Sequence, residues 1–147
     1  MVEHDPKPWI SALRASHDRL ASLVAPLDAD GVNRASMADE WTIAQVLSHL
    51  GSQAEIFGTI LDAGLAQSDP PSPDGFPAVW DAWNSRSARD QVADSVAAND
   101  AFVRKVEGLS RQQLDAVKVP MFGMDLDATR ILQMRLSEHA LHTWDVA

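Results

Sequence analysis

Three side chains in this sequence have the types and the spacing of ligands for a divalent metal ion. Glu138 and His142 lie four residues apart in an apolar stretch of helical periodicity near the end of the chain, and His49 lies in a second such stretch far upstream. Residues at i and i+4 project from one face of a helix. Two imidazoles and one carboxylate bind a divalent metal and leave coordination positions open. Nothing else in the sequence suggests a nucleophile or a cofactor-binding motif, so the sequence favours metal chemistry.

Each of these residues also has an explanation that needs no metal. Glu-x-x-x-His spacings are common by chance, and the polar line continues through Arg135 and Asp145, as it would on a solvated helix face. His49, between Val46 and Leu50, is equally typical of a histidine in a hydrophobic core. We interpret Asp145 as a partner that orients an imidazole or an arginine. The alternative is an exposed carboxylate at a frayed helix end.

The remaining histidines and the tryptophans have structural interpretations. His17 continues the apolar stripe of its helix, so we expect it to face the interior, as a candidate fourth ligand or substrate contact. His139 points away from the Glu138 pair and is predicted to lie at the surface or at an interface, and His4 falls in the N-terminal tail. Packing roles are expected for Trp41, Trp80, Trp83 and Trp144.

Four segments of helical periodicity predict an all-α fold, with only a short extended piece near residues 117–121. Thr42-Ile-Ala-Gln45 has the pattern of a capping box, and Asp125 and Asp127 are N-cap candidates for the last helix. The predicted helices span about residues 8–25, 42–64, 81–106 and 128–147.

The connections predict the order of the helices. A Pro-, Gly- and Asp-rich crossover at residues 67–81 is long enough to return along a bundle, so the second and third helices can run parallel. This gives an up-down-down-up four-helix bundle in which the second and fourth helices are antiparallel. His49 lies about 10 Å after the start of the second helix and His142 about 8 Å before the end of the fourth. The two histidines are therefore expected at the same depth.

Composition excludes several classes of function. The chain has 147 residues, enough for one domain, and its polar N-terminus lacks the pattern of a signal peptide, so we predict a cytoplasmic protein without a membrane span. The absence of cysteine excludes a disulfide framework, a thiolate zinc site and an internal sulfur nucleophile. The formal net charge of −9 opposes binding to nucleic acid. Any thiol chemistry needs a thiol from outside the chain.

Two segments resemble motifs of the mycothiol-dependent maleylpyruvate isomerase N-terminal domain family, within the DinB/YfiT-like superfamily. Residues 40–50 (EWTIAQVLSHL) are similar to the family's W-[ST]-x(5)-x-H-L element. Residues 135–145 (RLSEHALHTWD) are similar to its R-x-x-E-x-x-x-H-x-[VW]-D element. With four helices in matching order, the resemblance extends over nearly the whole chain. It implies a DinB-like four-helix bundle that holds a divalent metal, usually zinc, through His49, Glu138 and His142.

The resemblance also implies a reaction. Family members with known activity use the external thiol mycothiol, and coordination to the metal lowers the pKa of that thiol. The thiolate adds to the cis double bond of maleylpyruvate, permits rotation and leaves. An arginine on the third helix would suit the substrate carboxylates, and Arg86 and Arg89 are the candidates. Relatives commonly continue past the Trp-Asp pair into a C-terminal extension. For this chain we expect a single domain, residues 1–147, that lacks the extension.

Several functions stay open at this point. The leading hypothesis is a mycothiol-dependent metalloenzyme, an isomerase or thiol S-transferase, that acts on a small electrophilic or anionic substrate. A second is a metal-binding or stress-response module without turnover, and a third is a metal-free structural bundle. The sequence is consistent with both a monomer and a homodimer.

Overall fold

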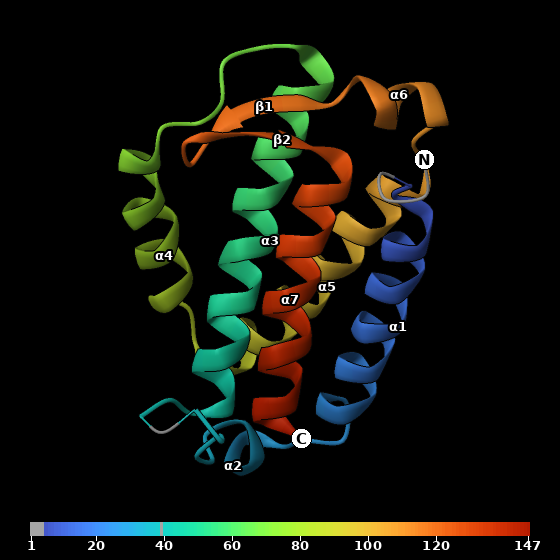
Figure 1. Cartoon of the computed structure of the whole chain (residues 1–147). Helices are drawn as coiled ribbons and strands as arrows, with labels where there is room; N and C mark the ends of the chain where they lie inside the picture. The colour runs from blue at the N-terminus through green and yellow to red at the C-terminus, as the bar shows by residue number, and fades with distance from the viewer. Residues whose placement is uncertain (1–4, 39) are drawn as a thin grey trace.

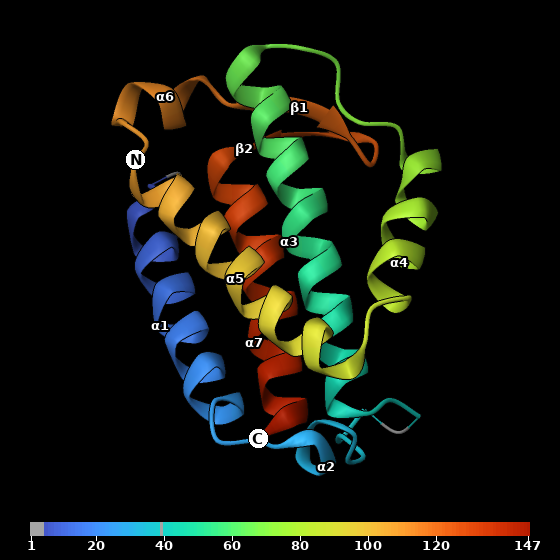
Figure 2. The same cartoon turned by 180° about the vertical axis from the view of Figure 1, so that it is seen from behind.

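Four long helices lie side by side and form the body of the molecule (Figure 1). The computed structural model describes residues 5–38 and 40–147, so His4 lies outside the described residues. Two of the long helices run in one direction and two in the other, and α3 is parallel to α5 but antiparallel to α7 (Figures 1 and 2). The predicted all-α four-helix bundle is confirmed. The long helices are α1 (Lys7–Val24), α3 (Ile43–Ala66), α5 (Ala88–Glu107) and α7 (Ala128–Val146).

Shorter elements occupy the connections and correct part of the prediction. The helix expected at residues 81–106 is two helices, because the Ser87 side chain accepts the Asp90 N–H and starts α5 afresh. The crossover contains helix where a loop was expected, and α4 lies outside the bundle beside α3 (Figures 1 and 2). A hairpin covers one end of the bundle; its first strand agrees with the short extended piece expected near residues 117–121, and its second strand was not predicted. These elements are α2 (Ala29–Val32), η2 (Pro73–Gly75), α4 (Phe76–Asn84), α6 (Arg111–Ala116), β1 (Lys118–Met121) and β2 (Met124–Asp127).

Polar side chains fix the start of both helices that carry the candidate ligands. At α3 the capping box is present: Thr42 accepts the Gln45 N–H, and the Gln45 side chain accepts the Thr42 N–H. At α7 the cap is Asp127, which accepts the Arg130 N–H at 2.7 Å. Asp125, the other candidate, pairs with Pro120 in the hairpin instead. These caps set where each helix begins and hence the depth of its side chains.

A layer of polar side chains divides the interior of the bundle into two hydrophobic clusters. The larger cluster contains Leu61 and Leu132, and the smaller one contains Leu20 and Leu47. On each long helix, a buried polar residue lies in sequence between the residues of the two clusters. Buried polar groups are stable only when they are hydrogen-bonded, so the helices must keep the positions in which this layer forms its bonds. Its members include His17, Ser52, Asn99, Arg135 and His139.

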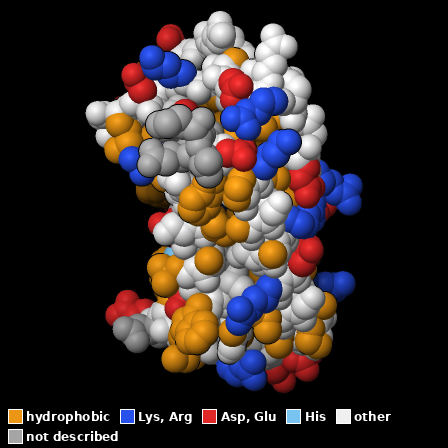
Figure 3. Space-filling model, turned by 45° about the vertical axis from the view of Figure 1, so that its right-hand side comes forward, with side chains coloured by type: hydrophobic (Ala, Val, Ile, Leu, Met, Phe, Trp, Pro, Cys, Tyr) orange, Lys and Arg blue, Asp and Glu red, His pale blue; other side chains and the backbone are white. Residues whose placement is uncertain are grey.

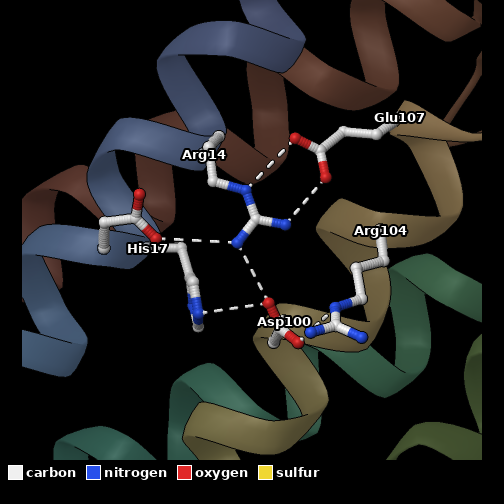
Figure 4. A network of polar contacts seen from close by, with 6 residues as sticks. Arg14, His17, Asp100, Arg104 and Glu107 are labelled. Atoms are coloured by element: carbon white, nitrogen blue, oxygen red, sulfur yellow. Dashed lines mark hydrogen bonds and ion pairs between the residues drawn. The ribbon is translucent and has the colours of Figure 1, made fainter.

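Ion pairs connect α1 to α5 beside this layer (Figure 4). Arg14 donates to both carboxylate oxygens of Glu107, at 2.7 and 3.1 Å, and to Asp100 at 3.0 Å. Asp100 also bonds Arg104 at 2.8 Å and faces the buried His17 ring at 3.6 Å. These bonds to Arg14 hold the pKa of both Asp100 and Glu107 below their ordinary values.

The described part of the molecule has a surface of mixed charge and no helix that could span a membrane. On the face shown in Figure 3, basic side chains are interspersed with acidic ones, and hydrophobic side chains gather in the middle and lower parts. Among the described residues, none of the helices has both the length and the apolar character required to cross a bilayer.

Replacement of Gly51 by alanine is expected to destabilise the protein by about 2 kcal/mol, because overpacking is costly in a tight contact. A Cβ at Gly51 would lie 2.3 Å from the ring of the buried Trp83, which packs α4 against α3. Gly58→Ala is the matched control, since nothing lies within 4 Å of its Cβ. That change should stabilise α3 by up to about 1 kcal/mol. Urea unfolding of both variants is the measurement, and equal effects would contradict this packing.

Replacement of Arg14 by glutamine is expected to lower the free energy of unfolding by about 1 kcal/mol at neutral pH. The ordinary pKa values of Asp100 and Glu107 are 3.8 and 4.5, and both are lowered in the fold. The ion pairs therefore stabilise the protein above this range, and the stabilisation is lost as the pH falls through the lowered values. The difference between wild type and variant should shrink with acidification. Arg19→Gln, an exposed change on the same helix, should show no such pH-dependent difference.

Candidate metal centre

The structure brings His49, Glu138 and His142 together at one level of the bundle. Each offers one donor atom, and these three atoms all lie within 4.8 Å of one another. Nε2 of His142 is 3.4 Å from Oε2 of Glu138, and Nε2 of His49 is 3.8 Å from the same oxygen. Ligand bonds of 2.0–2.2 Å place the donors of one tetrahedral ion about 3.3–3.6 Å apart. The three donors could hold a divalent metal if the most distant pair moved closer by about 1 Å.

The surroundings of both imidazoles suit metal ligands. Nδ1 of His142 lies 2.9 Å from Oδ2 of Asp145, one turn further along α7. A carboxylate at this position favours the proton on Nδ1, so the Nε2 lone pair points to the cluster. Burial, followed by the nearby His142, lowers the pKa of His49 and keeps its ring neutral at neutral pH. Asp145 thus lies where an orienting partner was expected.

Trp41 covers the two histidines from the segment before α3. Its ring centroid is 5.3 Å from that of His49 and 6.3 Å from that of His142, with the latter pair stacked. The carbonyl of Asp145 accepts the Met37 N–H at 2.8 Å, which links this segment to the end of α7. The sequence-based interpretation of Trp41 as a packing residue missed this contact. Its place one residue before the α3 cap was the available signal.

Arg135 joins α7 to α3 and, across the interior, to α5, and it lies one turn before Glu138 of the cluster. Its guanidinium is buried and donates to the Leu50 carbonyl at 3.2 Å, to Gln53 at 3.4 Å and to the Asn99 side-chain oxygen. Burial lowers its pKa to about 9, opposed by the negative charge of Glu138. At neutral pH it remains a cation, one turn before Glu138. The alternative of a solvated helix face therefore does not apply to Arg135.

His139 and His17 lie elsewhere in the polar layer. His139 was predicted at the surface or at an interface, but it is 1% exposed inside the bundle, and its Nδ1 lies 2.6 Å from the Ser16 hydroxyl of α1. Burial lowers its pKa to about 3, so it stays neutral. The correction follows from the close packing of α1 on this face of α7. His17 faces the interior as predicted, but it contacts Asp100 and is not part of the donor group.

The arginines predicted to bind substrate carboxylates are not in the cavity beside His49. The Arg86 guanidinium lies 3.7 Å from the centroid of the Trp83 ring and bonds Asp94. Arg89 is exposed on the first turn of α5. The cavity measures about 470 Å³, and no Lys, Arg, Asp or Glu is among the described residues that line it. Its lining residues are Trp41, Gln45, His49, Ser52, Trp80, Asn84 and Gln91.

A second, more open hollow borders the donor group at Glu138. It has a volume of about 360 Å³ and shares Glu138 with the cluster, while Arg130 supplies its basic group. The donor group therefore borders a neutral cavity at His49 and a hollow with an arginine at Glu138. The hollow is lined by Gln53, Phe57, Arg130, Gln133, Met134, Ser137 and Glu138.

Fold and donor group together define a class: a four-helix bundle with a candidate two-histidine, one-carboxylate centre between antiparallel helices. The sequence model of the mycothiol maleylpyruvate isomerase N-terminal domain matches residues 13–147. The chain belongs to this family.

The chain is also similar to curated proteins and, in its fold, to solved structures. Two uncharacterised proteins from strains of Mycobacterium tuberculosis are each 33% identical over 152 residues, which is 97% of this chain and 56% of theirs. The chain thus spans little more than half of their length. The mycothiol-dependent maleylpyruvate isomerase has the same fold, with a TM-score of 0.81 at 14% identity over 97% of this chain and 61% of that one. YfiT from Bacillus subtilis, described as a probable metal-dependent hydrolase, has a TM-score of 0.65 at 15% identity over 96% and 85%.

Replacement of Arg135 by methionine is expected to lower the free energy of unfolding by about 3 kcal/mol. The change leaves the buried Asn99 oxygen without this donor and removes a second bond from the Leu50 carbonyl, which keeps its bond within α3. An unpaired buried group costs about 1–3 kcal/mol. Arg130→Met is the matched control on the same helix, because its exposed side chain should matter by less than about 0.5 kcal/mol. Chemical unfolding separates the two. Equal stabilities would show that Arg135 does not hold the helices together.

Proposed function

We propose that this chain binds a divalent metal, zinc in the first place, through His49, Glu138 and His142, and that it forms the metal-binding domain of a mycothiol-dependent enzyme. The reaction is isomerisation of the maleylpyruvate type or thiol S-transfer. One observation carries the proposal: the three donor atoms converge within 4.8 Å from two antiparallel helices. Membership of the family and the absence of cysteine support an external thiol.

The residues of the chain have separable roles in this proposal. A bound divalent metal would lower the pKa of a coordinated thiol and so supply a thiolate nucleophile at neutral pH. Asp145 holds the His142 ring in the tautomer that presents Nε2, and burial keeps His49 neutral. Trp41 shields both rings from water on one side. Arg135 keeps α3 and α7 in register and adds a fixed positive charge near the centre.

A non-catalytic metal-binding or stress-response module is the second candidate. The neutral lining of the cavity favours it over maleylpyruvate isomerisation, because that substrate carries two carboxylates and Arg86 and Arg89 are not in the lining. Thiol-conjugation assays with mycothiol and electrophiles, with and without zinc, distinguish the two candidates. Turnover that requires both mycothiol and metal supports the enzyme, and its absence supports the module.

The metal proposal predicts stoichiometric zinc binding that is lost when any ligand is removed. His49→Ala, Glu138→Ala and His142→Ala should each abolish it in isothermal titration calorimetry and elemental analysis. Glu55→Ala, an exposed carboxylate on α3 outside the donor group, should bind zinc as the wild type does. Asp145→Asn should weaken binding by about tenfold to a hundredfold, the usual effect of removing a partner that orients a ligand. A wild-type protein that binds no zinc would refute the proposal.

A further inference from the structure

Four polar atoms in or next to the polar layer have no hydrogen-bond partner among the described residues. Two of them lie on α5: the hydroxyl of Ser95 and the amide nitrogen of Asn99. The others are Nδ1 of His17 on α1 and Nε2 of His139 on α7. Each of the four side chains is less than one-tenth exposed. Folded proteins leave few buried polar groups unpaired, so four from three helices need a common explanation.

The side chains that carry these atoms surround the guanidinium of Arg135. Arg135 donates to the oxygen of Asn99, which leaves the amide nitrogen of the same side chain as the unpaired group. Ser95 lies one turn before Asn99 on the same face of α5, and His139 lies one turn after Arg135 on α7. Three of the four groups therefore belong to positions next to one buried cation.

The fourth group, His17, reaches the same place through the packing of α1. Nδ1 of His139 lies 2.6 Å from the hydroxyl of Ser16, the residue before His17. Nε2 of His17 faces Asp100 at 3.6 Å, and Asp100 follows Asn99 on α5 (Figure 4). The two nitrogens of an imidazole ring point in different directions, so Asp100 does not serve Nδ1. That nitrogen needs a partner inside the bundle.

The combination of these groups selects a small neutral ligand that both donates and accepts hydrogen bonds. The Asn99 nitrogen only donates, whereas the Ser95 hydroxyl takes either role and an imidazole nitrogen does so according to its tautomer. A cation would be repelled by Arg135. An anion would need charged donors, but both terminal nitrogens of Arg135 already donate to protein oxygens. Water meets these requirements, and proteins hold about one buried water per 27 residues.

From this arrangement we infer that the polar layer binds one or more internal water molecules, which bridge Ser95 and Asn99 of α5 to His17 of α1 and His139 of α7. A buried water typically makes about three hydrogen bonds to such groups. The bonds of Arg135 join α3, α5 and α7, and the bound water extends this network to α1. None of the four groups belongs to the candidate metal donors, so the inference does not depend on metal binding.

A high-resolution crystal structure of the whole chain tests the inference directly. It should show a water oxygen within about 3.2 Å of the Ser95 hydroxyl and of at least one of the other three atoms. Crystals soaked in bromide should show no anomalous density in the layer, since an anion would give such a signal. A layer without water, or a bromide peak next to Arg135, would overturn the inference.

Removal of the Ser95 hydroxyl provides an independent test in solution. If water bonds this hydroxyl, Ser95→Ala should raise the equilibrium constant of unfolding by about fivefold, the effect of one typical hydrogen bond. Ser22→Ala, at an exposed position of α1, is the matched control. It should leave the constant unchanged or lower it, because alanine has the higher helix propensity.

Urea unfolding measures both variants. A Ser95→Ala protein as stable as the wild type, or more stable, would contradict the inference, because removal of a hydroxyl that has no partner relieves the cost of its burial. In crystals of Ser95→Ala the water beside residue 95 should be lost, whereas Ser22→Ala should retain it. Retention of that water in both variants would equally count against the bridge.

Discussion

The guanidinium of Arg135 lies in the interior at the point where α3, α5 and α7 meet, and it donates only to neutral oxygens there. A buried cation is tolerated only when its donors are satisfied, so these helices must keep their relative positions. Its acceptor on α3, the Leu50 carbonyl, follows His49 directly, and Glu138 lies one turn after Arg135 on α7. The bond that satisfies the cation thereby sets the separation of the donor atoms.

The surrounding polar layer extends this constraint through the bundle. His17, Asn99 and His139 lie between the two hydrophobic clusters, where leucines would pack with less risk of unpaired groups. A polar layer at this depth keeps the register of the helices specific, because a shift by one turn would leave its hydrogen bonds unmade. The layer also places polar side chains next to the ligand cluster. Stability and the geometry of the donor group therefore depend on the same residues.

Local signals in the sequence predicted the long helices and the donor group well. The capping box at Thr42 and the aspartate cap of α7 are interactions between neighbours in the chain, and they fix the helix starts. Once those starts are known, helix rise alone gives the depths of His49 and His142. The predicted bundle order brought them to one level, and the structure has the three donor atoms together. The prediction that they bind metal remains to be tested.

The features that the sequence could not predict depend on contacts between distant segments. His139 is buried because α1 packs on it, and Arg86 is drawn away from the cavity by Trp83 and Asp94. The helix α4 lies in a crossover rich in proline and glycine, and its place follows from the Trp83 ring lying against Gly51. That same contact sets Trp80 and Asn84 opposite His49. Uncharged side chains therefore line the cavity where the sequence suggested arginines. This tertiary contact sets the chemistry next to the candidate centre.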